Sequence, residues 1–280
     1  MMDAFMQSLA RSGLSTKEKI VADGQLHRFH VNGDRPGSLN GWYVLFYGGI
    51  PAGAFGSWKT GEKHSWCLKD RNQLTTAERK EYKRQMSLAT QARAEEQEKR
   101  HNTARKKAEA IWKKSRNAPG DHPYLLAKAV RNHGLRLYKS SLVMPLRDGS
   151  GILWSLQFIA HDGEKQFLSG ARIRGCYFAI GTPVKAICIA EGYATGASIY
   201  EATGHAVAVA LNAGNMIAVA RTIRAKFPAI KIILCADNDT KTKGNPGVTK
   251  AREAARAVGG VLAIPNIDGD FNDLFRGGCL

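Results

Sequence analysis

The stretch KAICIAEGYATGASIYEATGHAVAVAL, residues 185–211, decides the fold, and KIILCADND follows it at residues 231–239. Its two apolar runs are short enough to be buried strands, and the segment between them has the length of a helix. Apolar strands that alternate with helices predict an α/β fold, in which helices flank the faces of a parallel sheet. The alternation continues toward the C-terminus, with strands expected at 185–190, 206–211, 231–236 and 261–264 and helices near 193–203, 215–227 and 247–258.

Acidic residues follow three of these strands. Glu191 comes directly after the first strand, and Asp237 and Asp239 follow the third. Asp270 and Asp273 lie beyond the fourth. Right-handed crossovers bring the carboxyl ends of parallel strands to one edge of a sheet, so we expect these carboxylates to gather there.

Such a group of carboxylates predicts a metal site. Crowded carboxylates repel one another unless a divalent cation neutralises them, and a few hard oxygen ligands suit Mg²⁺ or Mn²⁺. A metal held in this way supports in-line displacement at phosphorus. A single Asp-x-Asp pair also occurs in many surface turns, but acids after three strands of one sheet favour a shared site.

The charge of the chain indicates a polyanionic partner. Lysine and arginine number 41 against 24 aspartates and glutamates, which gives a net charge of +17. This excess favours nucleic acid, because neutralising phosphates releases condensed counterions. A lipid surface is the competing partner, but the sequence shows no basic amphipathic helix with bulky apolar anchors and no apolar run long enough to span a membrane.

The cysteines indicate the compartment. The five cysteines are scattered and form no C-x-x-C pair, which argues against a zinc ribbon and against a disulfide framework. The N-terminus also lacks the apolar block of a secretory signal. We therefore expect a cytoplasmic protein that binds no zinc.

Residues 1–70 are expected to form a small β-rich unit, because short apolar runs alternate there with Gly, Pro and Asn. Its aromatic residues either fill a small core, which is their commoner use, or stack on single-stranded bases. The aromatic residues concerned are Trp42, Phe46, Phe55 and Trp58.

Two further segments precede the α/β domain, which we assign to residues 183–280. Residues 71–118 predict a basic helical linker that begins at a capping box of Thr75 and Glu78. Alanine is nearly the only apolar residue in its middle, so we expect a solvated arm that either follows a phosphate backbone or is simply hydrated. Residues 119–182 predict a basic α+β subdomain with a short helix and a hairpin.

Several motifs carry a resemblance to a known family. EGYATGASIYEATG at 191–204 and IILCADND at 232–239 resemble the Toprim domain shared by primases, topoisomerases and some nucleases. IDGDFNDLF at 267–275 resembles the third acidic motif of the primase branch. LVMPLRDGSGILWSLQFI at 142–159 and KQFLSG at 165–170 resemble the basic subdomain that precedes Toprim in bacterial-type primases. The whole is similar to the primases of plasmids and phages.

The resemblance implies a DNA primase, a DNA-directed RNA polymerase that makes short RNA primers on single-stranded DNA from ribonucleoside triphosphates, for replication of a mobile element. Glu191 would bind a metal or position the primer 3′-hydroxyl and assist its deprotonation. Asp237 and Asp239 would hold Mg²⁺, and Asp270 and Asp273 would complete a second metal position. The residues implied to contact nucleic acid are Arg147, Lys165, Arg172 and Arg174.

The sequence departs from the family pattern at two points. Chromosomal primases have an additional acid four residues after the glutamate, where this chain has Thr195, so one metal position is expected either to be weaker or to be supplied by the loop of Asp270 and Asp273. Most primases also have an N-terminal zinc ribbon, which this sequence cannot form.

Unwinding is expected from a replicative helicase that is either separate or fused in a longer native chain. A Toprim nuclease and a non-catalytic single-strand-binding accessory protein are the alternatives.

Overall fold

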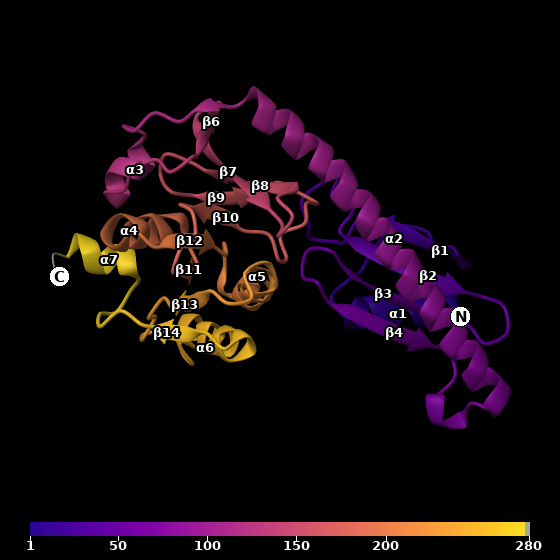
Figure 1. Cartoon of the computed structure of the whole chain (residues 1–280). Helices are drawn as coiled ribbons and strands as arrows, with labels where there is room; N and C mark the ends of the chain where they lie inside the picture. Colours follow the sequence, from indigo (N-terminus) through magenta and orange to yellow (C-terminus); the bar gives the residue numbers. More distant parts are fainter. Residues whose placement is uncertain (278–280) are drawn as a thin grey trace. The chain divides into compact units, whose positions relative to one another are not determined.

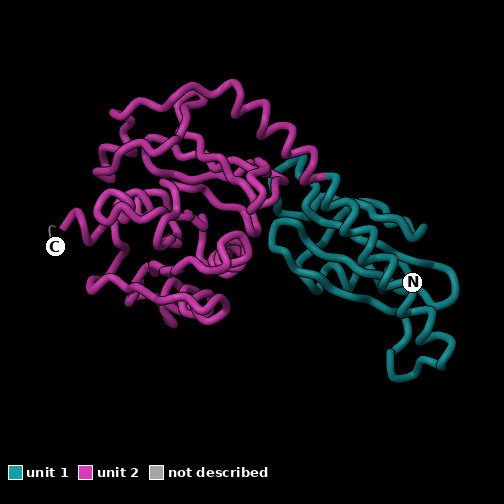
Figure 2. Tube along the Cα trace, in the orientation of Figure 1, with its two compact units in different colours: residues 1–99 teal, residues 100–280 magenta. Residues whose placement is uncertain are grey.

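The computed structural model describes residues 1–277. The chain forms two compact units, residues 1–99 and residues 100–280, which Figure 2 shows in different colours. The second unit contains the predicted α/β sheet and all the predicted site residues.

Within the described residues of the second unit, a five-stranded sheet lies at the centre (Figure 1). β11 pairs in parallel with β12 and β13, and β13 pairs in parallel with β14. β10 adds an antiparallel edge strand beside β12. The parallel sheet is therefore confirmed, and each predicted strand lies within two residues of the observed one. In spatial order the strands are β10 (Phe178–Ile180), β12 (Ala206–Val209), β11 (Ala186–Ala190), β13 (Lys231–Cys235) and β14 (Val261–Ala263).

Helices cover both faces of this sheet, because its side chains alternate between two apolar cores. Cys188 and Ala190 of β11 pack in one core with residues of α4. Ile187 and Ile189 point the opposite way, into a core with residues of α5 and α6. The predicted helix at 193–203 coincides with α4, and the other two agree within two residues. The helices are α4 (Tyr193–Thr203), α5 (Ala213–Lys226), α6 (Pro246–Val258) and α7 (Phe271–Arg276).

A second, antiparallel sheet precedes the parallel one in the chain. The predicted hairpin is β7 with β8, and Asp148 closes its turn by accepting hydrogen bonds from the backbone N–H groups of Ser150 and Ile152 at 3.0 and 3.1 Å. The predicted short helix is α3 (Pro123–Lys128). In spatial order the strands are β5 (Arg116–Asn117), β6 (Arg136–Tyr138), β7 (Ser141–Arg147), β8 (Leu153–Ile159) and β9 (Lys165–Phe167).

Buried polar side chains fasten this antiparallel subdomain to the parallel sheet. The Tyr193 hydroxyl donates to the Arg131 carbonyl and accepts from the His133 N–H, both at 2.8 Å. The Asn215 amide donates to the Cys176 carbonyl and accepts from the Gly175 N–H, at 3.0 and 2.8 Å. Such bonds explain why the two sheets form one compact unit.

A long helix, α2 (Thr76–Lys114), begins in the first unit and ends in the second. The predicted capping box is confirmed, since the Thr75 N–H donates to Glu78 Oε2 at 2.7 Å and the Glu78 N–H donates to Thr75 Oγ1 at 3.3 Å. The expectation of a wholly solvated arm is wrong, because Ala89, Ala104 and Ala108 are buried. Alanine lets a helix approach its neighbours closely, so these residues form the packing face.

The first unit is built on a four-stranded antiparallel sheet in the order β1–β2–β3–β4. Of the four aromatic residues, Trp42 and Phe55 are almost fully buried, whereas Phe46 and Trp58 are partly exposed. One helix was not expected: α1 (Met2–Arg11) packs Phe5 and Leu9 into the same unit. A short 3₁₀ helix (Arg71–Gln73) precedes α2. The strands are β1 (Asp23–Phe29), β2 (Gly41–Phe46), β3 (Ala52–Ser57) and β4 (Lys63–Cys67).

Candidate active site

The acids predicted at the strand ends lie at one edge of the parallel sheet. β11 and β13 are neighbours in register, with Ile189 opposite Leu234. Glu191 follows β11 and Asp237 follows soon after β13, so the two acids leave the same edge on adjacent strands. The chain passes from β11 to β12 on one side and then to β13 on the other, so this edge is a topological switch point, where open α/β sheets bind ligands.

Electrostatics identify the members of this acidic cluster, which we define as Glu191, Asp237, Asp239 and Asp270. Burial and the neighbouring charges of Glu191, Asp270 and Asp239 raise the pKa of Asp237 to about 7. Burial and the negative charges of Asp239 and Asp270 also raise the pKa of Glu191. Carboxylates that interact this strongly must be close together in a partly desolvated place.

One oxygen of the cluster lacks any partner. Oδ1 of Asp237 is buried and accepts no hydrogen bond in the described part of the chain. A buried carboxylate oxygen without a donor is costly, and a cation is the group that would satisfy it. This atom and the mutual repulsion of the acids fit a divalent metal. The ligands are not preassembled, however, since no three His, Cys, Asp or Glu side chains within residues 1–277 are arranged to hold one ion.

Lys165 lies with the acidic cluster, whereas the sequence suggested that it would group with Arg172 and Arg174. Burial and the charge of Lys128 lower its pKa, while Asp270, Glu191 and Asp237 act in the opposite direction. A Cβ atom built on Gly192 would lie 3.8 Å from Lys165 Nζ. The ammonium group of this surface-exposed residue therefore stands beside the carboxylates, at the start of α4.

Asp270 and Asp273 differ in their surroundings. The pair forms a capping box at the start of α7, in which Asp270 Oδ1 accepts from the Asp273 N–H at 2.9 Å and Asp273 Oδ2 from the Asp270 N–H at 3.3 Å. Asp270 also accepts a hydrogen bond from Thr195 Oγ1 at 2.7 Å. Thr195, at the position where the resemblance implies a further acid, thus holds Asp270 toward the cluster. Asp273 is not among the charges that shift the pKa of Glu191 or Asp237.

Asn238 is a positioning residue that sequence reasoning missed. Its side-chain amide donates to the carbonyls of Pro265 and Ile267 at 3.2 and 2.9 Å, and its Oδ1 accepts from Asn245 at 2.9 Å. Its backbone pairs with Gly269. Asn238 thereby ties the loop of Asp237 and Asp239 to the loop that leads to Asp270. Its place between two aspartates was the only available signal.

Replacing Asn238 by alanine should loosen both loops. Loss of these hydrogen bonds is expected to lower the free energy of unfolding by about 2 kcal/mol and to weaken Mn²⁺ binding. Urea denaturation and calorimetric Mn²⁺ titration measure the two effects. The exposed Asn117→Ala is the control, and equal behaviour of the two variants would contradict the positioning role.

The three predicted arginines lie apart from the cluster. Arg147 pairs its backbone with Tyr177 and donates from Nη1 to the Gly151 carbonyl at 2.9 Å. The guanidinium carbon of Arg172 lies 4.9 Å from the centroid of the Trp154 ring. Arg174 lines a shallow pocket at the start of α5.

Helix α2 adds positive charge to the Arg172 region. The guanidinium carbon of Arg105 lies 5.5 Å from the Trp154 ring centroid. Burial lowers the pKa of His101, and the charges of Arg172 and Arg100 lower it further. This basic surface, made of Arg105 and Arg172 over Trp154 with Arg100 near His101, combines cations with an aromatic ring, as surfaces that bind single strands do.

The raised pKa of Asp237 predicts how stability depends on pH without metal. Its pKa is about 7 in the folded protein and near 3.8 in the unfolded chain, so the folded state binds the proton more tightly. The resulting stabilisation, on the order of 4 kcal/mol at most, is present below pH 4 and lost as the pH rises through about 7. In EDTA, the melting temperature of Asp237→Asn should therefore increase relative to that of the unsubstituted protein as the pH rises. Parallel curves for the two proteins would contradict the assignment.

Comparison with known proteins supports the resemblance. Residues 186–278 match the Toprim domain. Two curated relatives, both the DNA primase TraC of Escherichia coli, are 34% and 32% identical over alignments that cover 94% of this chain. These alignments cover 26% and 19% of the relatives, so the chain spans about a quarter of their length or less.

Solved structures of primases are also similar. The primase fragment of the bacteriophage T7 primase–helicase protein has a TM-score of 0.45 and 16% identity, over 59% of this chain and 72% of that one. A DNA primase domain from Pseudomonas aeruginosa has a TM-score of 0.37 and 15% identity, over 51% and 48% of the two chains.

Proposed function

We propose that this chain, which contains a Toprim domain at residues 186–278 and is similar over 94% of its length to DNA primases, is the catalytic core of a primase. It would synthesise short RNA primers on single-stranded DNA from ribonucleoside triphosphates, for replication of a plasmid, phage or other mobile element. The observation that carries this proposal is the acidic cluster beside Lys165, at the switch point of the parallel sheet.

A divalent cation fits the cluster. Glu191, Asp237, Asp239 and Asp270 would hold it, with Asp273 a more distant candidate because the capping box engages its carboxylate. Bound there, Mg²⁺ or Mn²⁺ would neutralise the triphosphate and stabilise the attacking and leaving oxygens. The chemistry of the ligands, all carboxylates, suits either ion.

The side chains themselves would position the reactants. Glu191, with its raised pKa, is suited to accept the proton of the primer 3′-hydroxyl at its carboxylate. Lys165, the cation among the acids, would bind a phosphate of the incoming nucleotide. The remaining rate enhancement would come from orientation and charge complementarity.

The template would lie over basic side chains of the second unit. Arg147, Arg172 and Arg174 remain our candidates for contacts with nucleic acid, and the α2 residues Arg100 and Arg105 extend the surface near Arg172. The expected division into residues 1–70, 71–118, 119–182 and 183–280 also remains a proposal.

Location and partners complete the proposal. No helix in the described residues is long and apolar enough to cross a membrane. We propose a cytoplasmic enzyme that works with a replicative helicase, either separate or in the same longer chain. One neighbour, from bacteriophage T7, is described as part of a primase–helicase protein.

A primer-synthesis assay tests the function. The protein is incubated with random and homopolymeric single-stranded DNA, labelled ribonucleotides and Mg²⁺ or Mn²⁺. Short RNA products that require both metal and template are expected. Strand cleavage without such products would indicate a Toprim nuclease instead, and strand binding with neither reaction would indicate an accessory protein.

A further inference from the structure

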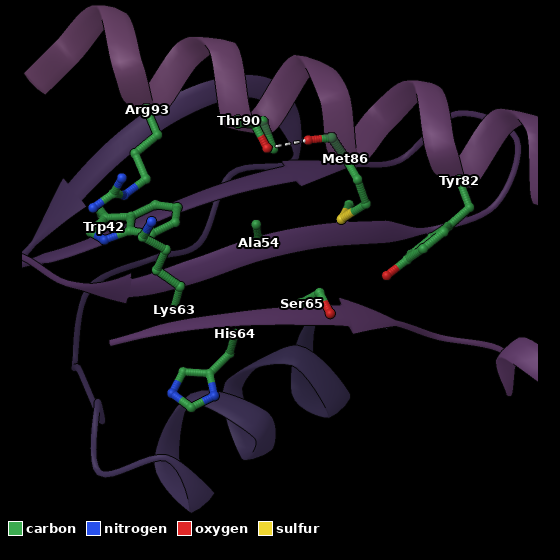
Figure 3. A pocket seen from close by; sticks show the side chains of 10 residues that line it. Trp42, Ala54, Lys63, His64, Ser65, Tyr82, Met86, Thr90 and Arg93 are labelled. Carbon is green, nitrogen blue, oxygen red and sulfur yellow. Dashed lines mark hydrogen bonds between the residues drawn. The ribbon is translucent and has the colours of Figure 1, made fainter. Parts of the chain in front are cut away.

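The first unit contains a pocket of about 370 Å³ between α2 and the face of the sheet formed by β2, β3 and β4 (Figure 3). Ala54 and Ser65 lie on the strands, where their small side chains leave space. Tyr82 and Met86 project toward them from α2. The volume is near the lower end of the roughly 300–1,000 Å³ of ligand pockets, so it suits a single small molecule or one residue of a polymer.

One end of this pocket is cationic. Lys63 and Arg93 lie there beside Trp42 in Figure 3, and the Arg93 guanidinium carbon is 5.2 Å from the Trp42 ring centroid. Arg93 Nε is buried without a hydrogen-bond partner among the described residues, and burial lowers the pKa of this side chain. No acidic residue lines the pocket within the described chain. Its positive charge is therefore available to an anionic ligand.

The other end carries aromatic and hydrogen-bonding groups. Arg71 lies 5.6 Å from the centroid of the Tyr82 ring and donates to Ser65 Oγ at 2.9 Å. The Ser65 hydroxyl keeps its own proton to donate, and the Thr90 hydroxyl, which donates to the Met86 carbonyl at 2.8 Å, can still accept. Flat apolar walls with polar groups at the edge suit a nucleobase.

We propose that this pocket binds one nucleotide, with its base between the strands and the Tyr82 and Met86 side chains and its phosphate at Lys63 and Arg93. The ligand is either a residue of single-stranded DNA or a free nucleotide. This proposal rests on the proposed function in one respect: the bound DNA strand is taken to be the template of the primase.

Site-resolved cross-linking on the full chain tests the pocket. The probes are a short oligodeoxythymidylate that carries one 5-iododeoxyuridine, and the free nucleotide 5-iododeoxyuridine monophosphate. After irradiation, mass spectrometry quantifies the adduct on the peptide that contains Tyr82. Ala54→Leu, which fills the pocket, and Arg93→Gln, which removes its charge, should each lower the adduct about tenfold. The exposed Arg35→Gln of the same unit should change it less than about twofold.

The possible outcomes distinguish a DNA strand from a free nucleotide as the ligand. They also distinguish failure of the pocket proposal from failure of the proposed primase function. An adduct with the oligonucleotide alone assigns the pocket to the strand, and an equal adduct with the monophosphate assigns it to free nucleotide. An adduct that is absent, or unchanged by Ala54→Leu in a protein with unaltered circular dichroism, overturns the pocket even if primers are made. If no primers are made but the adduct depends on Ala54 and Arg93, the proposed function fails and the pocket stands.

Discussion

Asp237→Asn should reduce primer synthesis by at least about 10³-fold while leaving the binding of single-stranded DNA nearly unchanged. The substitution keeps the shape of the side chain and removes its charge. Asp237 is the residue whose buried Oδ1 accepts no hydrogen bond within the described chain. A neutral amide oxygen is a weaker ligand for a divalent cation than a carboxylate oxygen, so Mn²⁺ affinity should fall together with synthesis. The strand is expected to stay bound, because the proposed phosphate contacts come from Arg147, Arg172 and Arg174.

Steady-state synthesis, calorimetric Mn²⁺ titration and fluorescence anisotropy with a labelled oligonucleotide measure the three quantities. Asp121→Asn, at an exposed position of the same unit, is the matched control. Without metal, Asp237→Asn should unfold at a higher temperature at neutral pH, because repulsion within the acidic cluster is relieved. Synthesis within about tenfold of the unsubstituted protein would exclude Asp237 from the catalytic machinery.

Lys165→Gln is expected to reduce synthesis by about 100-fold and to leave metal binding as tight or tighter. The ammonium group stands among the carboxylates, where its removal increases the negative potential felt by a cation. The loss should instead fall on the binding of the triphosphate, which would lose a positively charged partner.

Initial rates at varied ribonucleotide concentration, combined with Mn²⁺ titration, distinguish these effects. Lys185→Gln is the matched control, because Lys185 is exposed and precedes the opposite end of β11. A parallel loss of metal affinity and synthesis would show that Lys165 maintains the structure of the cluster and does not bind phosphate.

Local sequence was sufficient to predict four strands and three helices of the α/β domain, but not the edge strand β10 or helix α7. The helix at 193–203 was predicted at its observed bounds, and the four parallel strands within two residues. These predictions succeed because apolar periodicity and capping residues act over a few positions along the chain. Helix α1 was not predicted, although Phe5 and Leu9 have the four-residue spacing of one helix face.

The surroundings of the site residues could not be predicted in this way. The resemblance placed Lys165 among the contacts with nucleic acid, together with Arg172, yet β9 brings it to the acidic cluster. Asp270 and Asp273 were treated as equivalent, but hydrogen bonds to Thr195 and within the capping box make them different. Contacts of this kind depend on which distant segments pack together, and sequence spacing carries no information about them.

By itself, the sequence determined that acids follow three strands of a parallel sheet and that their shared edge is a candidate metal site. It could do so because strand direction and right-handed connection follow from local chemistry and chain chirality. Only the tertiary structure decided that β11 lies next to β13, so that Glu191 and Asp237 share one partly desolvated place, where the charge of Glu191 raises the pKa of Asp237. The physical reason is that strand order and burial are set by the packing of the two apolar cores, to which residues throughout the second unit contribute.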